Sequence, residues 1–500
     1  MYNHLFVINL SSITSIITSF INTPTLIAAF SLLHIAIIFA TVFIEKKKAS
    51  SSWAWLLVLI ILPYLGVILY LLLGRSIHRD KIYPYSKDKK IEFQKKLLQR
   101  DEPYIINDSN VVVKKNQNLI KLNYQSNQAF LSTNNEIEIL TEGKDKFDNL
   151  FEDIRNASSY IHVQYYIIKK DHLGNQLIDL LIEKLNQGVD VYLLYDDIGS
   201  RTLNSFTLRK LIKAGAKTKS FFKSQLPLIN LRMNYRNHRK LVVIDGEIAY
   251  TGGFNVGNEY IGLDKKMGNW RDTHLRIKGE AVSLLNLRFI DDWNSQASKK
   301  SDHIKINDYL INKTTTSSSL PIQIVTSGPD EEIDQIKYAY INMINNAKKY
   351  IYIQSPYFIL DESMMDALRM AILSGVDVKI MIPDRSDHPL IRWGNYSNVG
   401  KLIEDGATVY EYTRGFLHAK TMIIDDEVAS VGTANFDNRS FKLNFEINTF
   451  IYDIEETKKF RKIFMEDTRH STILSLEKYN NRSRLIKMKE SLAELISPIL

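Results

Sequence analysis

The chain begins with long runs of apolar residues. Residues 1–44 contain no Asp, Glu, Lys or Arg, and a second uncharged run covers residues 53–74. A helix rises about 1.5 Å per residue, so residues 26–44 and 53–74 are each long enough to cross about 30 Å of hydrocarbon. We therefore expect residues 1–75 to be a membrane-anchoring segment, a transmembrane helical hairpin; a buried helical hairpin is the alternative. Whether residues 5–21 form a third span stays open.

Basic residues flank these runs unequally. Three lysines occupy the connector at 46–48, whereas nine Lys and Arg residues lie between positions 75 and 100. Because Lys and Arg favour the cytoplasmic side, the excess predicts a multi-pass protein of the cell membrane with its C-terminal part in the cytoplasm. Residues 76–135 are predicted to be a basic juxtamembrane linker region lying against anionic headgroups.

Beyond residue 135, strand-like and helix-like segments alternate, and the pattern occurs twice. The apolar runs at 160–164 and 350–354 each follow an amphipathic helical pattern and precede a second helix that closes on Gly-Val-Asp-Val. Such alternation is typical of α/β units. We expect two pseudo-twofold-related α/β units with mixed sheets, at 136–310 and 320–475. Residues 476–500 have an apolar stripe at helical spacing and are predicted to be an amphipathic tail, either interfacial or packed on the core.

Composition narrows the classes of function. The chain has 500 residues and no cysteine, which excludes disulfides, thiolate metal sites and cysteine nucleophiles. A mean hydropathy of −0.16 is too polar for a multi-span transporter. The net charge of +8 suits a partner rich in phosphate, either nucleic acid or an anionic membrane, although a mildly basic soluble enzyme would have the same charge.

The same polar cluster occurs once in each repeat. The first copy has His238, Lys240 and Asp245, followed by Asn255; the second has His418, Lys420 and Asp425, followed by Asn435. Side chains alternate along a strand, so the His and Lys of each copy point to one face. A lone copy is more often structural, but two copies at matching spacings inside a repeat indicate function.

Two histidines and two lysines suit chemistry on a phosphodiester. Two ammonium groups neutralise the phosphate oxygens, while one neutral imidazole attacks phosphorus and the other, protonated, gives a proton to the leaving alkoxide. The sequence has no Gly-rich nucleotide loop, no His-Glu-x-x-His and no carboxylate cluster that requires a metal. We therefore expect neither a metal nor a cofactor in the chemistry.

At these residues the chain resembles the phospholipase D superfamily, whose signature is a paired H-x-K-x4-D. The stretches SSWAWLLVLIILPYLGVILYLLLGR, LPLINLRMNYRNHRK and TGGFNVGNEYIG are similar to bacterial cardiolipin synthases of the Firmicutes type, over residues 25–500. The resemblance implies transfer of a phosphatidyl group between two phosphatidylglycerol molecules, with release of glycerol. It implies His238 as nucleophile, His418 as acid and then base, phosphate binding by Lys240 and Lys420, and further donors at Asn255 and Asn435.

Several acidic residues accompany the motif. Asp245 and Asp425 are counted with the catalytic set by their place in the signature, although in the family such aspartates more often brace the local structure. Glu446 is the better candidate to orient an imidazole, and Asp272 is its less secure counterpart in the first half. The family often has Gly-Ser-x-Asn after each motif, whereas here the serine position holds Gly253 and Thr433.

Other interpretations stay open. A membrane-bound hydrolase, or a transphosphatidylase with another alcohol acceptor, would carry the same motifs, and sheltering of the intermediate from water decides between them. A non-catalytic scaffold that binds anionic lipid is the alternative from another class. The predicted spans argue against a nucleic-acid partner, and the sequence does not reveal the oligomeric state. Arg232, Arg236 and Arg239 either grip a lipid phosphate or form a solvated loop.

Overall fold

The computed structural model describes residues 24–40, 49–70, 74, 82–83, 87–99, 101–104, 110–203, 205–223, 234–264, 267–309 and 316–496. Contacts divide the chain into two compact units. The N-terminal unit comprises residues 1–76 and 226–234, and the main unit comprises residues 77–225 and 235–500. The predicted third span at 5–21 and the residue Arg232 lie outside the described residues.

The N-terminal unit consists of apolar helices with many exposed side chains. The helices are α2 (Pro24–Phe39), α3 (Ala49–Ile61) and α4 (Pro63–Leu69). Pro63 separates α3 from α4 because it cannot donate the backbone hydrogen bond that would continue α3. Within the described ranges, no helix is both long enough and apolar enough to cross a membrane. The predicted transmembrane hairpin therefore remains a prediction.

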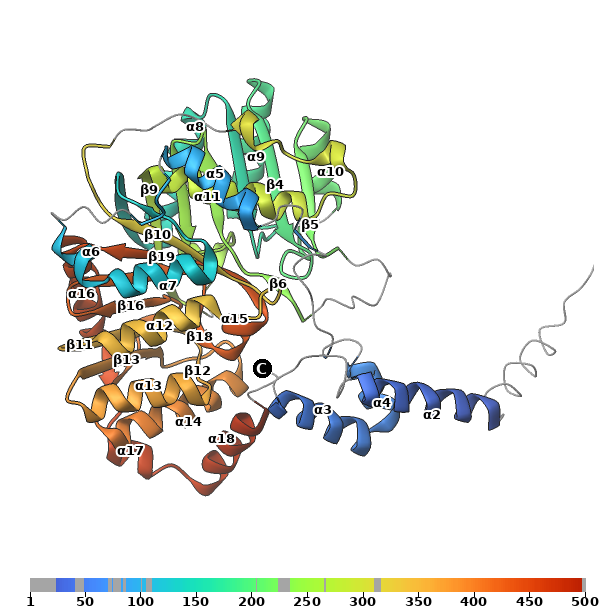
Figure 1. Cartoon of the computed structure of the whole chain (residues 1–500), viewed down its shortest axis with the longest axis vertical. Helices are drawn as coiled ribbons and strands as arrows, with labels where there is room; N and C mark the ends of the chain where they lie inside the picture. Colours follow the sequence, from blue (N-terminus) through green and yellow to red (C-terminus); the bar gives the residue numbers. More distant parts are fainter. Residues whose placement is uncertain are drawn as a thin grey trace, which may run out of the picture. The chain divides into compact units, whose positions relative to one another are not determined.

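The main unit contains two sheets of the same design (Figure 1). The strands of the first half are β2 (Asn135–Glu142), β3 (Tyr160–Tyr165), β4 (Asp190–Asp196), β5 (Lys217–Phe221), β6 (Arg236–Asn237), β7 (Leu241–Ile244), β8 (Ile248–Gly252) and β9 (Asn269–Gly279). Those associated with the second half are β1 (Leu131–Ser132), β10 (Ile322–Ser327), β11 (Tyr350–Gln354), β12 (Phe358–Ile359), β13 (Asp377–Pro383), β14 (Thr408–Tyr412), β15 (Gly415–Leu417), β16 (Thr421–Ile424), β17 (Val428–Gly432), β18 (Phe436–Asp437), β19 (Asn444–Tyr452) and β20 (Ser471–Ile473).

Strand order repeats between the halves. The order β9-β8-β7-β3-β4-β5 in the first sheet matches β19-β17-β16-β11-β13-β14 in the second. In each set the first three pairings are antiparallel and the last two are parallel. The predicted α/β repeat with mixed sheets is thus confirmed.

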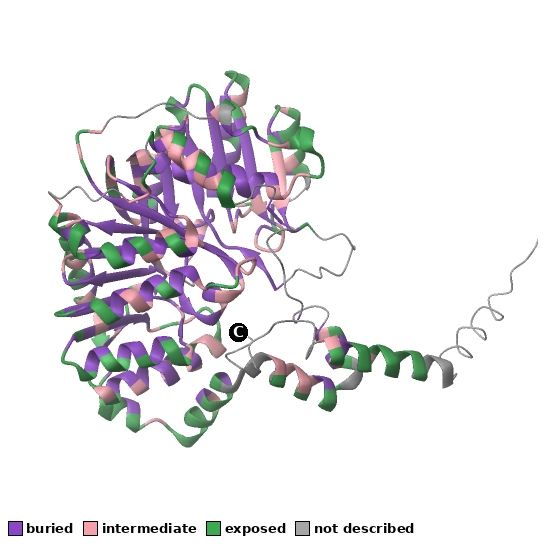
Figure 2. Ribbon diagram, in the orientation of Figure 1, coloured by how far each residue is buried: buried purple, intermediate pink, exposed green. Residues whose placement is uncertain are grey.

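Helices cover the sheets and turn their buried faces toward them (Figure 2). In the main unit they are α5 (Lys87–Leu98), α6 (Val111–Lys115), α7 (Gln117–Asn127), α8 (Gly143–Asn156), α9 (His172–Asn186), α10 (Ser205–Lys213), α11 (Glu280–Ser295), α12 (Gln335–Asn346), α13 (Glu362–Leu373), α14 (Pro389–Asp405), α15 (Asn438–Lys442), α16 (Ile454–Thr468), α17 (Leu476–Asn480) and α18 (Arg484–Ile496), with short 3-10 helices at Asn258–Ile261, Lys300–Asp302 and Ile306–Tyr309. One core cluster joins α11 to strands of both sheets, so the two halves fold as one body.

Two segments outside the predicted α/β units are also part of this body. Within residues 76–135, Val113 and Ile120 are buried in the second-half core, so much of the predicted linker is folded structure. At the C-terminal end, α18 packs on α14, where Glu494 accepts hydrogen bonds from Ser397 (2.8 Å) and Lys401 (2.5 Å). Leu485, Met488 and Leu492 of α18 remain exposed.

Candidate active site

The first motif begins where the chain crosses from one half to the other. Strand β6 pairs in parallel with β19 of the second half, and the next backbone amide, that of His238, donates to the carbonyl oxygen of Phe445 (3.0 Å). From Leu241 the chain returns to its own sheet as β7. His238 is therefore held between the two halves by main-chain hydrogen bonds.

The second motif repeats this arrangement in the opposite direction. Strand β15 pairs in parallel with β9 of the first half, and the amide of His418 donates to the carbonyl oxygen of Arg271 (2.7 Å). Thr421 then begins β16 in the second sheet. In each half, the short strand before the motif thus pairs with a strand of the other half.

Each imidazole contacts a carboxylate that comes from the other half. Both oxygens of Glu446 lie 3.0 Å from Nδ1 of His238, and Oδ2 of Asp272 lies 2.6 Å from Nδ1 of His418. A carboxylate on Nδ1 fixes the tautomer and leaves Nε2 for chemistry. Glu446 and Asp272 are completely buried. Both residues named as candidate orienting acids thus contact an imidazole, and their orienting role stays a prediction.

The two motif lysines, Lys240 and Lys420, are fully buried. Lys240 donates to the carbonyl oxygen of His238 (2.7 Å), and Lys420 donates to that of His418. Burial lowers the pKa of Lys240 well below its usual value and lowers the pKa of Lys420 to about 8. The charge of Lys420 also lowers the pKa of Lys240.

Burial disfavours the charged form of both histidines. Burial lowers the pKa of His238, and the charge of Lys240 adds to this effect while Glu446 opposes it. Burial and Lys420 together lower the pKa of His418 to about 3. A bound anion would favour the protonated imidazole again, because an opposite charge stabilises the charged form.

Both histidines line one cavity of about 510 Å³. Aromatic rings pack on the imidazoles: Tyr166 on His238 with centroids 5.0 Å apart, and Trp270 on His418, also at 5.0 Å. Ile167 and Met267 are apolar members of the wall; its polar and charged members are Lys169, Arg236, Asn255, Glu259, Tyr260, Asp264, Tyr357, Asp387, Asn435, Asp437, Arg439 and Asn444. Sequence reasoning missed Asp437 and Arg439; comparing them with Gly257 and Glu259 at the same repeat positions could have found them.

The motif aspartates do not reach this cavity. Asp245 accepts hydrogen bonds from the backbone amides of Ser158, Ser159 and Tyr160, at 2.7–2.8 Å. Asp425 makes the same three bonds with residues 348–350, at 2.7–2.9 Å. Both stand beyond the far ends of β7 and β16, and their geometry is that of braces for the turns before β3 and β11.

The asparagines of the two copies differ. In Asn255 the side-chain oxygen accepts from the amide of Ile167 (3.2 Å) and the nitrogen donates to Tyr260 (3.0 Å). In Asn435 the side-chain oxygen is buried and has no hydrogen-bond partner. The side-chain oxygen of Asn435 can therefore still accept a hydrogen bond.

Gly253 and Thr433, which replace the serine often found in the family, both lie next to an orienting carboxylate. Thr433 donates from Oγ1 to Oε2 of Glu446 (2.5 Å), so its hydroxyl faces the orienting acid. At Gly253 a Cβ atom would lie 1.9 Å from Oδ1 of Asp272. The glycine provides the space that this carboxyl group fills.

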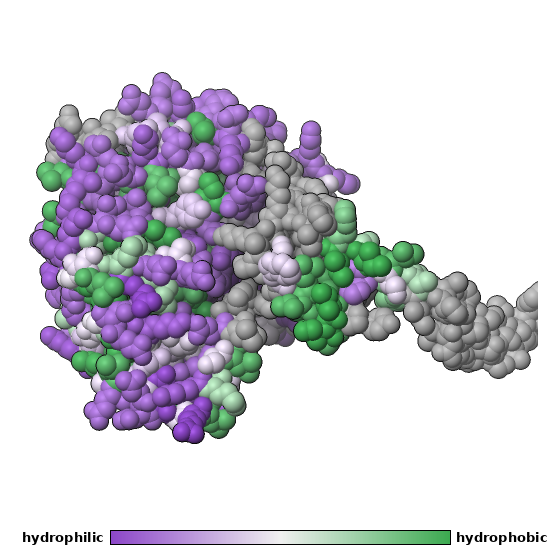
Figure 3. Space-filling model, turned by 60° about the horizontal axis from the view of Figure 1, so that its bottom comes forward, coloured by the Kyte–Doolittle hydropathy of each residue, from purple (hydrophilic) through white to green (hydrophobic). Residues whose placement is uncertain are grey.

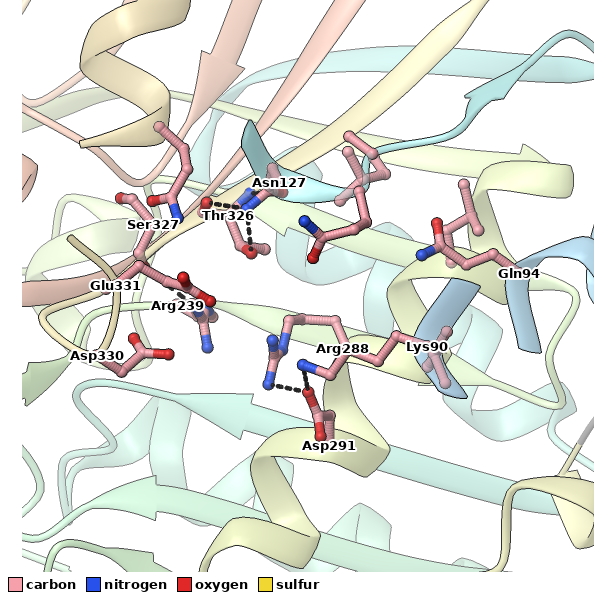
Figure 4. A pocket seen from close by; sticks show the side chains of 17 residues that line it. Lys90, Gln94, Asn127, Arg239, Arg288, Asp291, Thr326, Ser327, Asp330 and Glu331 are labelled. Atoms are coloured by element: carbon pink, nitrogen blue, oxygen red, sulfur yellow. Dashed lines mark hydrogen bonds and ion pairs between the residues drawn. The ribbon is translucent and has the colours of Figure 1, made fainter. Parts of the chain in front are cut away.

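Arg239 points away from the catalytic cavity, as expected for the residue between His238 and Lys240 on an extended segment. It lines a separate pocket of about 90 Å³ together with Arg288 and Asp330 (Figure 4). Its Nη1 lies 2.7 and 2.8 Å from the two oxygens of Asp292, and its Nε donates to the carbonyl oxygen of Glu446 (3.0 Å). Of the three arginines considered for phosphate binding, Arg236 lines the cavity and Arg239 does not.

No group of three or more His, Asp or Glu side chains in the described part of the chain could hold a metal ion. Two imidazoles, two guanidinium groups and the ammonium group of Lys169 line the cavity, and the buried Lys240 and Lys420 contact the carbonyl oxygens of the two histidines. Such a set can bind a phosphodiester anion and supply one nucleophile and one acid.

Comparison with known proteins agrees with this geometry. A family model described as "Cardiolipin synthase, PLD-like domain" matches residues 150–293 and 340–468, and one described as "Phospholipase_D-nuclease N-terminal" matches residues 27–75. A cardiolipin synthase from Staphylococcus aureus strain Mu50 is 50% identical over 475 residues, covering 94% of this chain and 95% of the relative. One from Oceanobacillus iheyensis is 47% identical over 485 residues, covering 96% and 99%.

The fold also occurs in a solved structure. The crystal structure of phosphatidylserine synthase from Haemophilus influenzae Rd KW20 matches with a TM-score of 0.58 and 16% identity, over 77% of this chain and 100% of that chain. At this identity the likeness concerns the fold alone. Since the family model covers more than half of this chain and the relatives match nearly its whole length, the chain belongs to the cardiolipin synthase family of phospholipase D-like phosphatidyltransferases.

Proposed function

We propose that the protein transfers a phosphatidyl group from one phosphatidylglycerol molecule to another, giving cardiolipin and glycerol. The observation that carries this proposal is the pair of histidines in one cavity, each with a carboxylate from the other half on its Nδ1. The identity of about 50% to cardiolipin synthases supports the choice of substrates.

In the first step, Nε2 of His238 attacks the phosphorus atom of the donor lipid. The bond between phosphorus and the glycerol oxygen breaks, and protonated His418 gives its Nε2 proton to that oxygen, so that glycerol leaves. The phosphatidyl group is then bound covalently to His238. Glu446 is suited to this role of His238, because it holds the Nδ1 proton and keeps the Nε2 lone pair available. Asp272 contacts Nδ1 of His418 in the same way, so the choice of His238 rests on the family resemblance.

In the second step, the primary hydroxyl of another phosphatidylglycerol attacks the phosphohistidine. His418 takes the proton of that hydroxyl, the P–N bond breaks, and cardiolipin forms. Lys240 and Lys420 offset the negative charge of the phosphoryl oxygens in both steps. The anionic substrate raises the pKa of His418, so the acid is charged when it is needed.

We also propose that residues 1–75 hold the enzyme in the cell membrane, with the main unit on the cytoplasmic side. Large apolar side chains such as Leu32, Ile35, Trp53 and Ile60 are exposed on α2–α4, and exposure to water would be costly. Figure 3 shows hydrophobic residues in green gathered on the N-terminal helices, whereas the visible face of the main unit is mostly hydrophilic. A chain without residues 1–75 is expected to leave the membrane fraction, while His238→Ala stays in it.

The reaction is tested in vesicles that contain phosphatidylglycerol as the only phospholipid. Glycerol release and lipid products are followed together for the wild-type protein, His238→Ala and His418→Ala. Cardiolipin and glycerol in equal amounts, absent in both variants, are expected. Phosphatidic acid in place of cardiolipin would show a hydrolase instead.

The roles of the two histidines are tested by trapping the intermediate. With donor lipid labelled at phosphorus and acid-free denaturing quench, label is expected on the protein in His418→Ala and absent in His238→Ala. The reverse result would exchange the two roles. Glu446→Gln is expected to lower transfer by about 10³-fold or more, by analogy with the loss of an orienting carboxylate in other histidine sites.

A further inference from the structure

The two halves build equivalent walls of the cavity from different chemistry. The segment after Asn255 pairs with Ile168 through Val256, and the segment after Asn435 pairs with β12 through Phe436. Two residues beyond each asparagine, the first half has Gly257 and the second has Asp437. The carboxylate of Asp437 therefore has no counterpart across the pseudo-twofold axis.

Asp437 and Glu259, two acids of the cavity wall, differ in their partners. It is only 6% exposed and lines the cavity, and its Oδ1 accepts from the amide of Ser440 (2.6 Å). Glu259, another acid in the wall, forms an ion pair with Lys169 (2.6 Å). In the described part of the chain, no cation lies within ion-pair distance of Asp437. Burial raises the pKa of Asp437 to about 6.

A second acceptor is present in the same wall. Tyr357 donates its phenolic proton to Asp387, which leaves the phenolic oxygen able to accept a hydrogen bond. Burial and the charges of Asp387 and Asp437 raise the pKa of Tyr357 well above its usual value, so Tyr357 stays protonated and lies in the field of both acids. Asp437 and Asp387 also both act on the charge of Lys420.

These acceptors do not suit the phosphate itself. A carboxylate repels a phosphodiester anion. Such a wall can accept hydrogen bonds from hydroxyl groups of a ligand. In phosphatidylglycerol, the hydroxyl-bearing part is the terminal glycerol, which is attached directly to the reacting phosphate.

We propose that Asp437, together with Tyr357 and Asp387, binds the free hydroxyl groups of that glycerol and makes the site select glycerol over monohydroxy alcohols. The inference rests on the proposed transfer reaction and adds the specificity-determining residues for its alcohol. The leaving glycerol and the entering headgroup occupy the same place, because the second step reverses the first with a different alcohol. Asp437 therefore acts in both steps.

The experiment measures how the phosphatidyl-enzyme divides between two alcohols. Full-length protein in phosphatidylglycerol vesicles receives equal concentrations of labelled glycerol and 1-propanol. Labelled phosphatidylglycerol and phosphatidylpropanol are quantified, and their ratio does not depend on how fast the intermediate forms. In Asp437→Asn this ratio is expected to fall by about tenfold or more, as for the loss of a charged hydrogen bond.

Two further variants separate recognition from folding. Asparagine still caps the helix that begins after position 437, and Asp453→Asn makes the same change at the cap of α16, away from the cavity. Asp453→Asn is expected to keep the wild-type ratio. Should Asp437→Asn not fold, Tyr357→Phe is expected to lower the ratio in the same direction.

An unchanged ratio in a folded Asp437→Asn protein, with both products reduced equally, would overturn the proposal. If the wild-type protein forms phosphatidylpropanol and labelled phosphatidylglycerol equally well, the proposal also fails while the transfer reaction stands. If the wild-type protein forms no transfer product at all, the proposed function fails, and this inference fails with it.

Discussion

At the scale of single residues, the site depends on which groups leave room for the orienting carboxylates. Gly253 and Thr433 occupy equivalent repeat positions, yet one accommodates Asp272 and the other donates to Glu446. Gly253→Ser would place Cβ against the Asp272 carboxyl group and displace it from His418. We expect transfer to fall by about 10²-fold or more, since an unoriented imidazole loses the correct tautomer.

The control for this prediction is Thr433→Ser, which keeps the hydroxyl at the equivalent position. Initial rates of cardiolipin formation and thermal unfolding are measured for both variants. Equal activity of Gly253→Ser and Thr433→Ser would show that the glycine is not needed for the Asp272–His418 contact.

The charge of Lys420 is expected to determine how kcat/KM of the transfer reaction depends on pH on the alkaline side. Burial lowers the pKa of Lys420 to about 8. As the pH rises through this value, the ammonium group loses its charge and no longer offsets the phosphate, so kcat/KM, which reports the free enzyme, is expected to decline. The measurement is kcat/KM between pH 6 and 10 for the wild-type protein and Lys420→Arg.

Arginine stays charged over this whole range. Lys420→Arg is therefore expected to be less active but to lack the decline near pH 8. An identical decline in both proteins would assign it to another group.

At the scale of elements, exchange of short strands between the halves positions the histidines. β15 can pair with β9 only because Gly415 has no side chain: a Cβ atom there would lie 2.0 Å from the carbonyl oxygen of Asn269. Gly415→Ala is expected to push β15 from β9, to move His418, and to lower transfer by more than about tenfold, in keeping with the sensitivity of catalysis to small displacements.

Gly394→Ala is the matched control. Its Cβ atom would meet only the side chain of Ile359, at 2.8 Å, and alanine favours the interior of α14. Near wild-type activity is expected for Gly394→Ala. Wild-type activity of Gly415→Ala as well would contradict the role assigned to the β15–β9 contact.

At the scale of the whole molecule, one buried carboxylate ties several distant segments together. Asp292 on α11 accepts hydrogen bonds from Tyr83 (3.1 Å), Gln164 (2.8 Å), Arg239 and Arg288. Asp292→Ala would leave Arg239 buried without its partner. We expect the free energy of unfolding to fall by about 3–5 kcal/mol, the usual cost of breaking a buried ion pair from one side.

Chemical denaturation of Asp292→Ala and of Glu455→Gln, which removes an exposed ion pair with Lys458, tests this expectation. The exposed pair is expected to contribute about 1 kcal/mol or less. Although burial alone would raise it, Arg239 and Arg288 bring the pKa of Asp292 down to about 2. A lowered pKa means that this stabilisation is complete above the unfolded value near 4 and is lost as the pH falls toward 2. A pH-independent difference between wild type and Asp292→Ala would contradict it.

The sequence by itself determined the repeat, the mixed α/β class and the residue types of the site. Alternation of apolar and polar positions is a local property, and the matching of the motifs around His238 and His418 needs no structure. The likeness to the phospholipase D superfamily, carried by the same residues, indicated phosphatidyl transfer.

Only the tertiary structure decided which carboxylate serves which histidine, and that Asp437 faces the cavity. Glu446 and His238 are 208 positions apart, and their contact follows from the crossing of β6 into the other sheet. The structure also shows that Arg236 lines the cavity whereas Arg239 does not. Asp245 and Asp425 contact the turns before β3 and β11 and do not line the cavity. Spacing along a strand gives the face on which a side chain lies, whereas the partners on that face come from segments that only folding brings together.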